Sequence, residues 1–383
     1  MIIGIDASNI KGGGGVTHLK ELLENANPAK YGFTKVILWS VTKTLSQIED
    51  RPWLTKANCS ELSGNRILRW YWQKFKLSEL AREQKCDLLF VPGGSFSGNF
   101  RPFVTMSQNL LPFEWGELRR YGFSIFTLRL ILLYLFQGAT FRKAQGIIFL
   151  TKYAENRILN KLNIENRNVV IIPHGINEKF FHKPKIQSEF MDRRNDNPIE
   201  LLYVSFIGAY KHQWNVVEAV AKLNKQGIRI HLSLVGALSE KSSARKLRLK
   251  MNEFKPLDGI VSLYTDVSYE KISRFYQNAD LFLFASTCEN LPNILIEAMA
   301  SGLPIVSSNF GPMPEVLEDA GLYFNPLSVE DIMNQLKALI SSKSLRVELA
   351  AKAFKKAKFY SWVTNAETTF SFFQKVVIDF SKN

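Results

Sequence analysis

Two glutamates inside one apolar stretch are the residues of this sequence best suited to chemistry. Glu289 precedes a predicted helix and Glu297 lies within it, with seven residues between them. Apolar runs at 281–285 and 304–308 flank the helix, which predicts a strand, a helix and a second parallel strand. The N-terminus of such a helix offers free backbone N–H groups to a phosphate, and carboxylates beside it can accept hydrogen bonds from sugar hydroxyls. Taken alone, the pair could also be ordinary surface charge.

The residues around both glutamates, Glu289 to Ser307 (ENLPNILIEAMASGLPIVS), resemble the signature of retaining glycosyltransferases of family 4. The resemblance implies an α/β fold of the GT-B type, in which two Rossmann-like, doubly wound parallel-sheet domains face a central cleft. It also implies that Glu289 contacts the transferred sugar and that Glu297 contacts the ribose of the nucleotide. The residues at the N-terminus of this helix are expected to bind the donor as well: Asn290, which can cap the preceding turn, Leu291, and Pro292 at the first helical position.

A lysine follows the first predicted strand of the C-terminal half. Lys211 lies in the loop between the apolar run 201–206 and a helix, where a cation can neutralise a diphosphate. Members of the family have a lysine at this position that contacts the donor phosphates. Phe206 stands where they commonly have an arginine, which predicts a weaker diphosphate clamp. Tyr264, at the end of the predicted strand 260–264, is expected near the nucleotide base.

A run of four glycines follows the first predicted strand, residues 1–6. Such a run lets the backbone pass close to a ligand. Members of family 4 often have a glycine-rich loop here, between the acceptor and the donor diphosphate. Three residues are assigned to this loop by the resemblance: Gly13, Gly14 and Gly15. The helix that follows is expected to open at Val16 or Thr17.

Two polar side chains of the N-terminal half are expected near the substrates. Asn109 lies, with Gln108, where relatives often have a histidine close to the sugar. His174 belongs to the sequence Pro-His-Gly-Ile, which resembles the hinge between the two domains of the family, and it could line the cleft or only cap the turn. His18, one turn into the first helix, is interpreted as structural.

At 383 residues the chain is long enough for two α/β domains of similar size. We expect a Rossmann-like acceptor-binding domain at 1–178, a Rossmann-like nucleotide-sugar-binding domain at 179–360, and a terminal helix at 361–383 that crosses back to the first domain, as in the family. A polar, proline-flanked linker is expected at 183–198. The other strands are predicted at 35–39, 87–91, 103–107, 146–151, 168–172 and 228–235, with helices between them.

The chain is strongly basic, with a formal net charge of +14 at pH 7 and a pI of about 9.5. Residues 1–180 carry 24 basic and 14 acidic side chains, a net charge of +10, whereas residues 181–383 carry 25 and 21, a net charge of +4. We therefore expect the N-terminal half to contact something anionic. The charge also suggests a nucleic-acid-binding protein. Because the basic residues are scattered and form no tail, nucleic acid is not an expected partner.

One segment, Phe123–Phe141, is apolar over nearly the length of a membrane-spanning helix. It contains Arg129 and Gln137, and a spanning helix here would split a Rossmann-like domain, so we do not expect it to cross a membrane. Two interpretations stay open: a helix of the protein core and a helix lying in the membrane interface. We expect the protein to be cytoplasmic and to bind peripherally to the anionic inner face of the membrane.

The cysteines Cys59, Cys86 and Cys288 are far apart and form no Cys-x-x-Cys pair, so neither a disulfide framework nor a zinc site is predicted. No secretory signal peptide is expected at the N-terminus. The sequence has no Asp-x-Asp motif, so we expect no metal that bridges the donor diphosphate and no cofactor. The nucleotide-diphosphate sugar would be a donor substrate.

The residues and the resemblance together predict a retaining, metal-independent glycosyltransferase of the hexosyltransferase type. The predicted acceptor is a glycan or lipid-linked glycan in the biosynthesis of a surface polysaccharide such as O-antigen or lipopolysaccharide. This choice rests on three segments that resemble O-antigen-type members: Thr-His-Leu after the glycines, Gln108 to Phe113, and Lys211 to Trp214. The alternative is a non-catalytic relative that binds a lipid or a partner enzyme, because Phe206 and the missing histidine depart from the family pattern.

Overall fold

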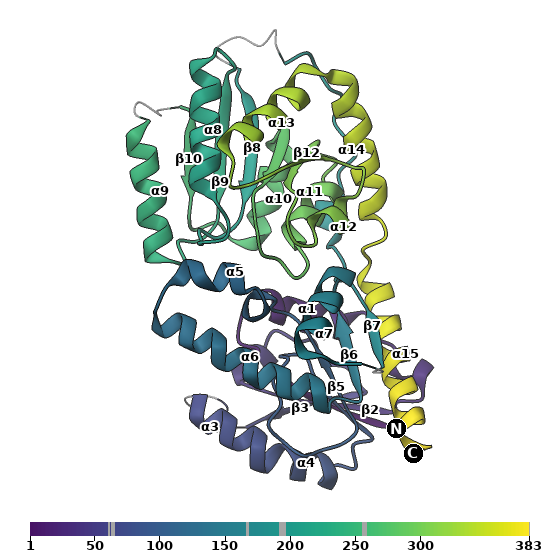
Figure 1. Cartoon of the computed structure of the whole chain (residues 1–383). Helices are drawn as coiled ribbons and strands as arrows, with labels where there is room; N and C mark the ends of the chain where they lie inside the picture. The colour runs from purple at the N-terminus through teal and green to yellow at the C-terminus, as the bar shows by residue number, and fades with distance from the viewer. Residues whose placement is uncertain (60–61, 63–65, 166–167, 191–196, 255–258, 383) are drawn as a thin grey trace. The chain divides into compact units, whose positions relative to one another are not determined.

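The computed structural model describes residues 1–59, 62, 66–165, 168–190, 197–254 and 259–382. The chain divides into two compact units, each built around one parallel β-sheet with helices (Figure 1). The first unit consists of Met1–Leu118, Gly122–Gly175 and Ser361–Asn383, and the second of Arg119–Tyr121 and Ile176–Tyr360. The C-terminal segment thus belongs to the same unit as the N-terminus.

The first unit contains a seven-stranded parallel sheet with the strand order β3-β2-β1-β4-β5-β6-β7. Its strands are β1 (Ile2–Asp6), β2 (Lys35–Ser40), β3 (Leu54–Asn58), β4 (Leu88–Val91), β5 (Phe103–Met106), β6 (Gly146–Phe149) and β7 (Val169–Ile171). The central strands β4, β5 and β6 are buried and largely apolar, as expected for strands covered on both faces. The chain order reverses between β1 and β4, so the sheet has a topological switch point there.

Helices and helical turns connect these strands: α1 (Gly14–Glu24), α2 (Thr42–Leu45), α3 (Arg66–Tyr71), the π-helix η3 (Trp72–Lys76), α4 (Leu77–Glu83), α5 (Trp115–Leu118), α6 (Ile125–Lys143) and α7 (Lys152–Leu162). The last helix of the chain, α15 (Trp362–Ser381), packs against α1. Its buried phenylalanines contact the sheet, where the ring centroid of Phe373 lies 4.9 Å from that of Phe90 in β4. These contacts make α15 part of the hydrophobic core of the first unit.

The second unit contains a six-stranded parallel sheet with the order β10-β9-β8-β11-β12-β13. Its strands are β8 (Ile199–Val204), β9 (Ile230–Val235), β10 (Val261–Tyr264), β11 (Leu281–Phe284), β12 (Ile305–Ser308) and β13 (Leu322–Phe324). Its helices are α8 (Gln213–Lys225), α9 (Lys241–Glu253), α10 (Tyr269–Asn278), α11 (Asn293–Ala300), α12 (Met313–Leu317), α13 (Val329–Ser341) and α14 (Lys343–Ala357). Here the switch point lies between β8 and β11. Helix α8 packs against α9 and α13, and α11 packs against α14.

Most expected strands begin and end within two residues of the observed ones, but two strands were not expected. Strand β3 (sequence LTKAN) carries polar residues because it lies at the edge of its sheet, and β13 is an edge strand of three residues. The expected start of the first helix was also wrong. Helix α1 begins at Gly14 and not at Val16 or Thr17, because the last glycines of the run adopt helical backbone geometry.

The expected linker at 183–198 is partly packed onto the second unit; its residues 191–196 lie outside the described part of the chain. The fully buried guanidinium of Arg346 in α14 donates to Gln187 Oε1 (3.1 Å) and to the Ser188 carbonyl (2.6 Å). It also lies 3.7 Å from the ring centroid of Phe190. Residues 187–190 therefore form a fixed part of the second unit.

Helix α6 is the apolar segment whose place the sequence left open. Its length and hydropathy would allow it to cross a membrane, but it also contains buried polar residues, Gln137 and Thr140. Seven of its large apolar side chains are exposed instead: Ile125, Phe126, Leu128, Ile131, Leu132, Leu135 and Phe136. A core helix would show the opposite pattern, so the core does not enclose α6.

Candidate active site

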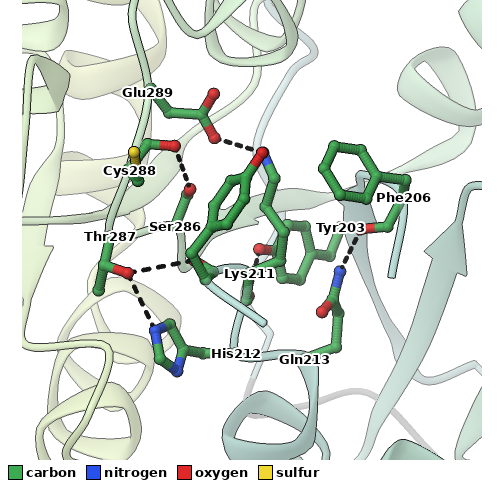
Figure 2. Close-up of polar contacts among 10 residues, drawn as sticks. Tyr203, Phe206, Lys211, His212, Gln213, Ser286, Thr287, Cys288 and Glu289 are labelled. Atoms are coloured by element: carbon green, nitrogen blue, oxygen red, sulfur yellow. Dashed lines mark hydrogen bonds and ion pairs between the residues drawn. The ribbon is translucent and has the colours of Figure 1, made fainter. Parts of the chain in front are cut away.

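Lys211 and Glu289 form a buried ion pair at the switch point of the second sheet (Figure 2). Lys211 lies in the loop after β8, and Glu289 in the loop after β11. Strands β8 and β11 are parallel neighbours, so both loops leave the same edge of the sheet. The carboxyl edge at a switch point is where open α/β sheets bind ligands. The two residues that the resemblance assigned to the donor are thus brought into direct contact by the topology.

Aromatic rings surround the ammonium group of Lys211, whose side chain is only 3% exposed. Its Nζ atom lies 5.1 Å from the ring centroid of Phe206, 5.1 Å from that of Tyr210 and 5.3 Å from that of Phe284. Ring faces attract a cation, and the nearby Glu289 carboxylate offsets part of the cost of burying it. The site therefore holds a fixed positive charge beside a partly exposed carboxylate.

Hydrogen bonds fix the two loops to each other (Figure 2). His212 Nε2 lies 3.1 Å from Thr287 Oγ1, and the Thr287 amide donates to the Tyr210 carbonyl at 2.9 Å. The buried hydroxyl of Tyr203 donates to the Lys211 carbonyl at 2.5 Å. Burial keeps the pKa of His212 low, at about 3, so this imidazole is neutral at physiological pH. No sequence pattern indicated Tyr203, His212 or Thr287, because their partners are set by the packing of two distant loops.

Phe206 lies inside this site. Besides facing Lys211, its ring packs edge-on against Tyr210 at 5.8 Å, and its carbonyl accepts a 2.8 Å hydrogen bond from Gln213 Nε2. A Cβ atom on Gly208 would lie 2.5 Å from the Phe206 ring, so this loop needs a glycine there. An aromatic ring thus stands beside Lys211 at the position where the sequence predicted the loss of an arginine.

Glu297 lies deep in α11 and is 6% exposed. The hydroxyl of Tyr276, on α10, donates to its Oε2 atom at 2.9 Å. Burial raises the pKa of Glu297 to about 7, although the Tyr276 hydrogen bond and the positive charge of Lys179 act in the opposite direction. A carboxyl group with this pKa can both accept and donate a hydrogen bond near neutral pH. No sequence pattern indicated Tyr276 either, since it lies 21 residues from Glu297 in the chain.

We expect Glu297→Gln to stabilise the free protein at high pH while it weakens nucleotide binding. The folded state holds the Glu297 proton up to about pH 7, whereas the unfolded chain releases it near pH 4.5. The stability of the wild type therefore falls between these values, by about 3 kcal/mol. The amide has no proton to lose, so the melting temperatures of variant and wild type should agree near pH 4.5 and diverge toward pH 8. Parallel curves would contradict this, and exposed Glu330→Gln is the control.

The N-terminus of helix α11 differs slightly from the expectation. Helix α11 begins at Asn293, so Pro292 is its N-cap residue and not its first helical residue. No side chain caps this helix, and a cap of the preceding turn by Asn290 stays a prediction. Within its first turn, the Asn293 and Leu295 amides already donate to the Leu291 and Pro292 carbonyls, at 3.0 and 2.8 Å. Asn290 and Leu291 are buried beside Glu289.

Tyr264 lies away from the pair of Lys211 and Glu289. It ends β10, which is two strands away from β8 in the sheet. Its ring packs against Phe275 at 4.9 Å and lines a cavity of about 400 Å³ that also contains Glu200 and His231. Its contact with the nucleotide base stays a prediction.

In the first unit, the glycine run follows β1 at the other switch point. Gly13 has a φ of 63° and a ψ of −155°, a conformation open to glycine only. Gly14 and Gly15 form the first turn of α1, whose N–H groups lack helical partners. Gln108 faces this turn, since its Oε1 atom would lie 3.4 Å from a Cβ atom on Gly15. The exposed Asn109 instead accepts a hydrogen bond from the Leu111 amide, so Gln108 is the residue that approaches the glycines.

His174 is buried in a cluster of aromatic rings. It stacks on Trp362 of α15 with a centroid distance of 5.5 Å, and the His18 ring lies 4.9 Å from His174 and 5.9 Å from Trp362. Burial and the neighbouring His174 keep the pKa of His18 well below its usual range. The cluster fixes α1 and α15 to the turn after β7. The ring contacts of His174 are thus mainly packing contacts with His18 and Trp362.

Comparison with protein families supports the assignment of the second unit. Residues 185–356 match the family model described as glycosyl transferases group 1. This region contains Lys211, Glu289 and Glu297.

The chain is also similar to curated proteins. An uncharacterized glycosyltransferase of Haemophilus influenzae is 24% identical over 289 residues, 73% of either chain. The amylovoran biosynthesis glycosyltransferase AmsD of Erwinia amylovora is 26% identical over 218 residues, 57% of this chain and 58% of AmsD. The sulfoquinovosyl transferase SQD2 of Arabidopsis thaliana is 29% identical over 114 residues, 28% of this chain and 22% of SQD2. The matches thus span from about a fifth to about three quarters of these relatives.

Solved structures resemble the whole chain. Sucrose-phosphate synthase from Thermosynechococcus elongatus gives a TM-score of 0.74 at 19% identity, covering 100% of this chain and 99% of the other. Anabaena HepE in complex with UDP and glucose gives a TM-score of 0.67 at 17% identity, covering 100% of this chain and 99% of HepE. WaaG, a glycosyltransferase involved in lipopolysaccharide biosynthesis, gives a TM-score of 0.66 at 17% identity, covering 97% of this chain and 98% of WaaG.

These likenesses show the GT-B fold expected from the sequence, with two Rossmann-like α/β domains. The family match covers the unit in which the Lys211 and Glu289 loops meet. Residues 185–356 thus match the model of the group 1 glycosyl transferases, and the whole chain has the GT-B fold.

Proposed function

We propose that the protein is a retaining glycosyltransferase that uses a nucleotide-diphosphate sugar. The observation that carries this proposal is the buried pair of Lys211 and Glu289 at the carboxyl edge of neighbouring parallel strands. A fixed cation beside the N-termini of α8 and α11 suits a departing diphosphate, and an adjacent carboxylate suits the sugar. The intact pair favours a catalyst over a non-catalytic relative.

In the proposed reaction, the bond between the anomeric carbon and the phosphate oxygen breaks, and its electron pair leaves with the nucleoside diphosphate. Lys211 and the helix-end amides stabilise the charge that develops there. The acceptor hydroxyl bonds to the same carbon on the same face, and its proton passes to the leaving phosphate oxygen. Glu289 orients the sugar, and Glu297 holds the ribose. No metal ion takes part in this scheme, because Lys211 supplies the positive charge.

We further propose that the acceptor is a glycan or lipid-linked glycan in surface polysaccharide biosynthesis, as for O-antigen. The names of AmsD and WaaG point to polysaccharide and lipopolysaccharide assembly in those proteins. In this scheme the first unit binds the acceptor, with its glycine turn and Gln108 near the reacting hydroxyl.

A panel of UDP-, GDP-, dTDP- and CMP-sugars tests the donor. We expect one nucleotide class to stabilise the protein, because a ligand at about 100 times its dissociation constant adds about 2.7 kcal/mol to the folded state. For a unit of this size, the melting temperature should rise by about 5–10 °C. Glu289→Gln and Lys211→Ala proteins serve as controls. If no nucleotide sugar shifts the melting temperature, the proposal fails.

We also propose that the protein binds peripherally to an anionic membrane surface through α6. The exposed apolar side chains of this helix and the excess positive charge of residues 1–180 suit such a surface.

The double variant Leu132→Ser/Leu135→Ser should bind anionic vesicles at least about tenfold less tightly than the wild type, since two half-exposed leucines no longer insert. The matched control is Leu249→Ser/Phe359→Ser, which alters exposed apolar residues of the second unit. High salt should release part of the bound wild-type protein. Equal binding by both variants would contradict a role for α6.

A further inference from the structure

A second apolar surface lies outside α6, on the consecutive helices α3 and η3. Five large apolar side chains within nine residues are exposed there: Ile67, Leu68, Trp70, Tyr71 and Phe75. Ile67 is 73% exposed and Tyr71 52%. Soluble surfaces rarely gather side chains of this size, so the group indicates contact with a partner. We call these five residues the α3 patch.

The charges around the α3 patch indicate what covers it. The ten residues from Ile67 to Lys76 include three Arg or Lys and no Asp or Glu. The ammonium group of Lys74 lies 4.7 Å from the ring centroid of Trp70 and 5.1 Å from that of Phe75, so positive charge and exposed rings occupy the same surface. Tryptophan and tyrosine beside basic side chains match the interface of a bilayer that contains anionic lipids.

The π-helix η3 explains how one short segment presents exposed side chains and is also anchored to the first unit. Trp72 and Gln73 point inward and are buried, directly between the exposed Tyr71 and the exposed Lys74. Gln73 Nε2 donates to Asp6 Oδ2 at 2.5 Å and to the Ser95 carbonyl at 2.9 Å. Asp6 ends β1, at the switch point of the first sheet. The patch is therefore held by the sheet edge that also precedes the glycine turn.

We propose that the α3 patch is a second membrane contact, which inserts Trp70, Tyr71 and Phe75 into an anionic lipid surface and places Lys74 at the level of the headgroups. The proposal rests on the proposed lipid-linked acceptor. Because Gln73 ties the segment to Asp6, binding of the patch sets the orientation of the acceptor edge relative to the membrane. It is independent of α6, since different residues carry it.

Two vesicle experiments on the full chain test the proposal. The triple variant Trp70→Ser/Tyr71→Ser/Phe75→Ser keeps α6 intact. It should partition at least about tenfold less tightly than the wild type into phosphatidylcholine vesicles with roughly 30% phosphatidylglycerol. Lys74→Glu should weaken binding to these vesicles and leave binding to pure phosphatidylcholine unchanged. The control is Leu249→Ser/Val347→Ser/Phe359→Ser, which replaces equally exposed residues of the second unit.

The insertion of Trp70 is measured directly. Brominated lipid chains should quench the fluorescence of the wild type more than that of Trp70→Phe, and the difference reports Trp70. Unchanged partitioning of the triple variant, or no quenching assigned to Trp70, would overturn the α3 patch as a membrane contact. A protein partner would then be the better occupant. If α6 variants alone lose binding, the proposal for α6 stands and this inference fails; nucleotide-sugar binding is unaffected in either case.

Discussion

Glu289→Gln is expected to lower the turnover number of glycosyl transfer by about 10²-fold or more, with a smaller change in the KM for the donor. The amide keeps the size of the side chain but removes the negative charge that faces Lys211. The sugar then loses its orienting carboxylate, and the ammonium group loses its partner. Because the interaction with the reacting sugar strengthens in the transition state, turnover should change more than donor binding.

Initial rates with a radiolabelled or coupled donor assay separate the two parameters. Glu330→Gln, an exposed change on α13, is the control for the loss of one carboxylate. The melting temperature of Glu289→Gln should fall moderately, because a buried cation is left without its ion-pair partner. A variant with nearly normal turnover would remove Glu289 from the reaction.

The sequence predicted the site mainly through residues close together in the chain. The stretch from Leu281 to Ser308 carries its own strand, loop and helix signals, so its βαβ form follows from the local pattern. Lys211 was identified from its place between a strand and a helix together with the resemblance to the lysine of the family. Their contact follows from the strand order, which places β8 beside β11. A doubly wound fold has this order, but the contact between the two side chains was not among the predictions from the sequence.

The contacts that tune the site were not predictable in this way. Tyr276 meets Glu297 because α10 lies beside α11, and His212 meets Thr287 across a separation of 75 residues. Such pairs depend on side-chain packing, which a single sequence does not specify. Gln73 is a similar case, since only the π-helix turns it toward Asp6. The edge strands β3 and β13 were missed because short or polar strands lack a strong periodic signal.

Lys211→Ala should cost at least about tenfold in catalytic efficiency, more than the loss of an exposed lysine. A charge-assisted hydrogen bond contributes roughly 1.5–3 kcal/mol, and this ammonium group is held between rings and a carboxylate. Lys241→Ala, at the exposed start of α9, is the control. An efficiency within twofold of the wild type would show that the donor diphosphate is bound elsewhere.

Phe206→Arg is the reciprocal experiment. The new guanidinium would lie near the Lys211 ammonium group, whose distance to the present ring is 5.1 Å. In the free protein the two cations repel, so the melting temperature should fall. A nucleoside diphosphate between them neutralises both charges. Its affinity should therefore rise several-fold, and the ligand should recover the lost melting temperature.

Phe206→Leu separates the effect of the added charge from the effect of losing the aromatic ring. It removes a cation–π contact without adding a donor, so it should weaken nucleoside diphosphate binding slightly through a less ordered Lys211. Calorimetry and thermal melting on the same samples compare the three proteins. A lower melting temperature for Phe206→Arg without any gain in affinity would mean that the ring serves only packing. The loop after β8 would then not face the diphosphate, and the chemical role of Lys211 would have to be assigned anew.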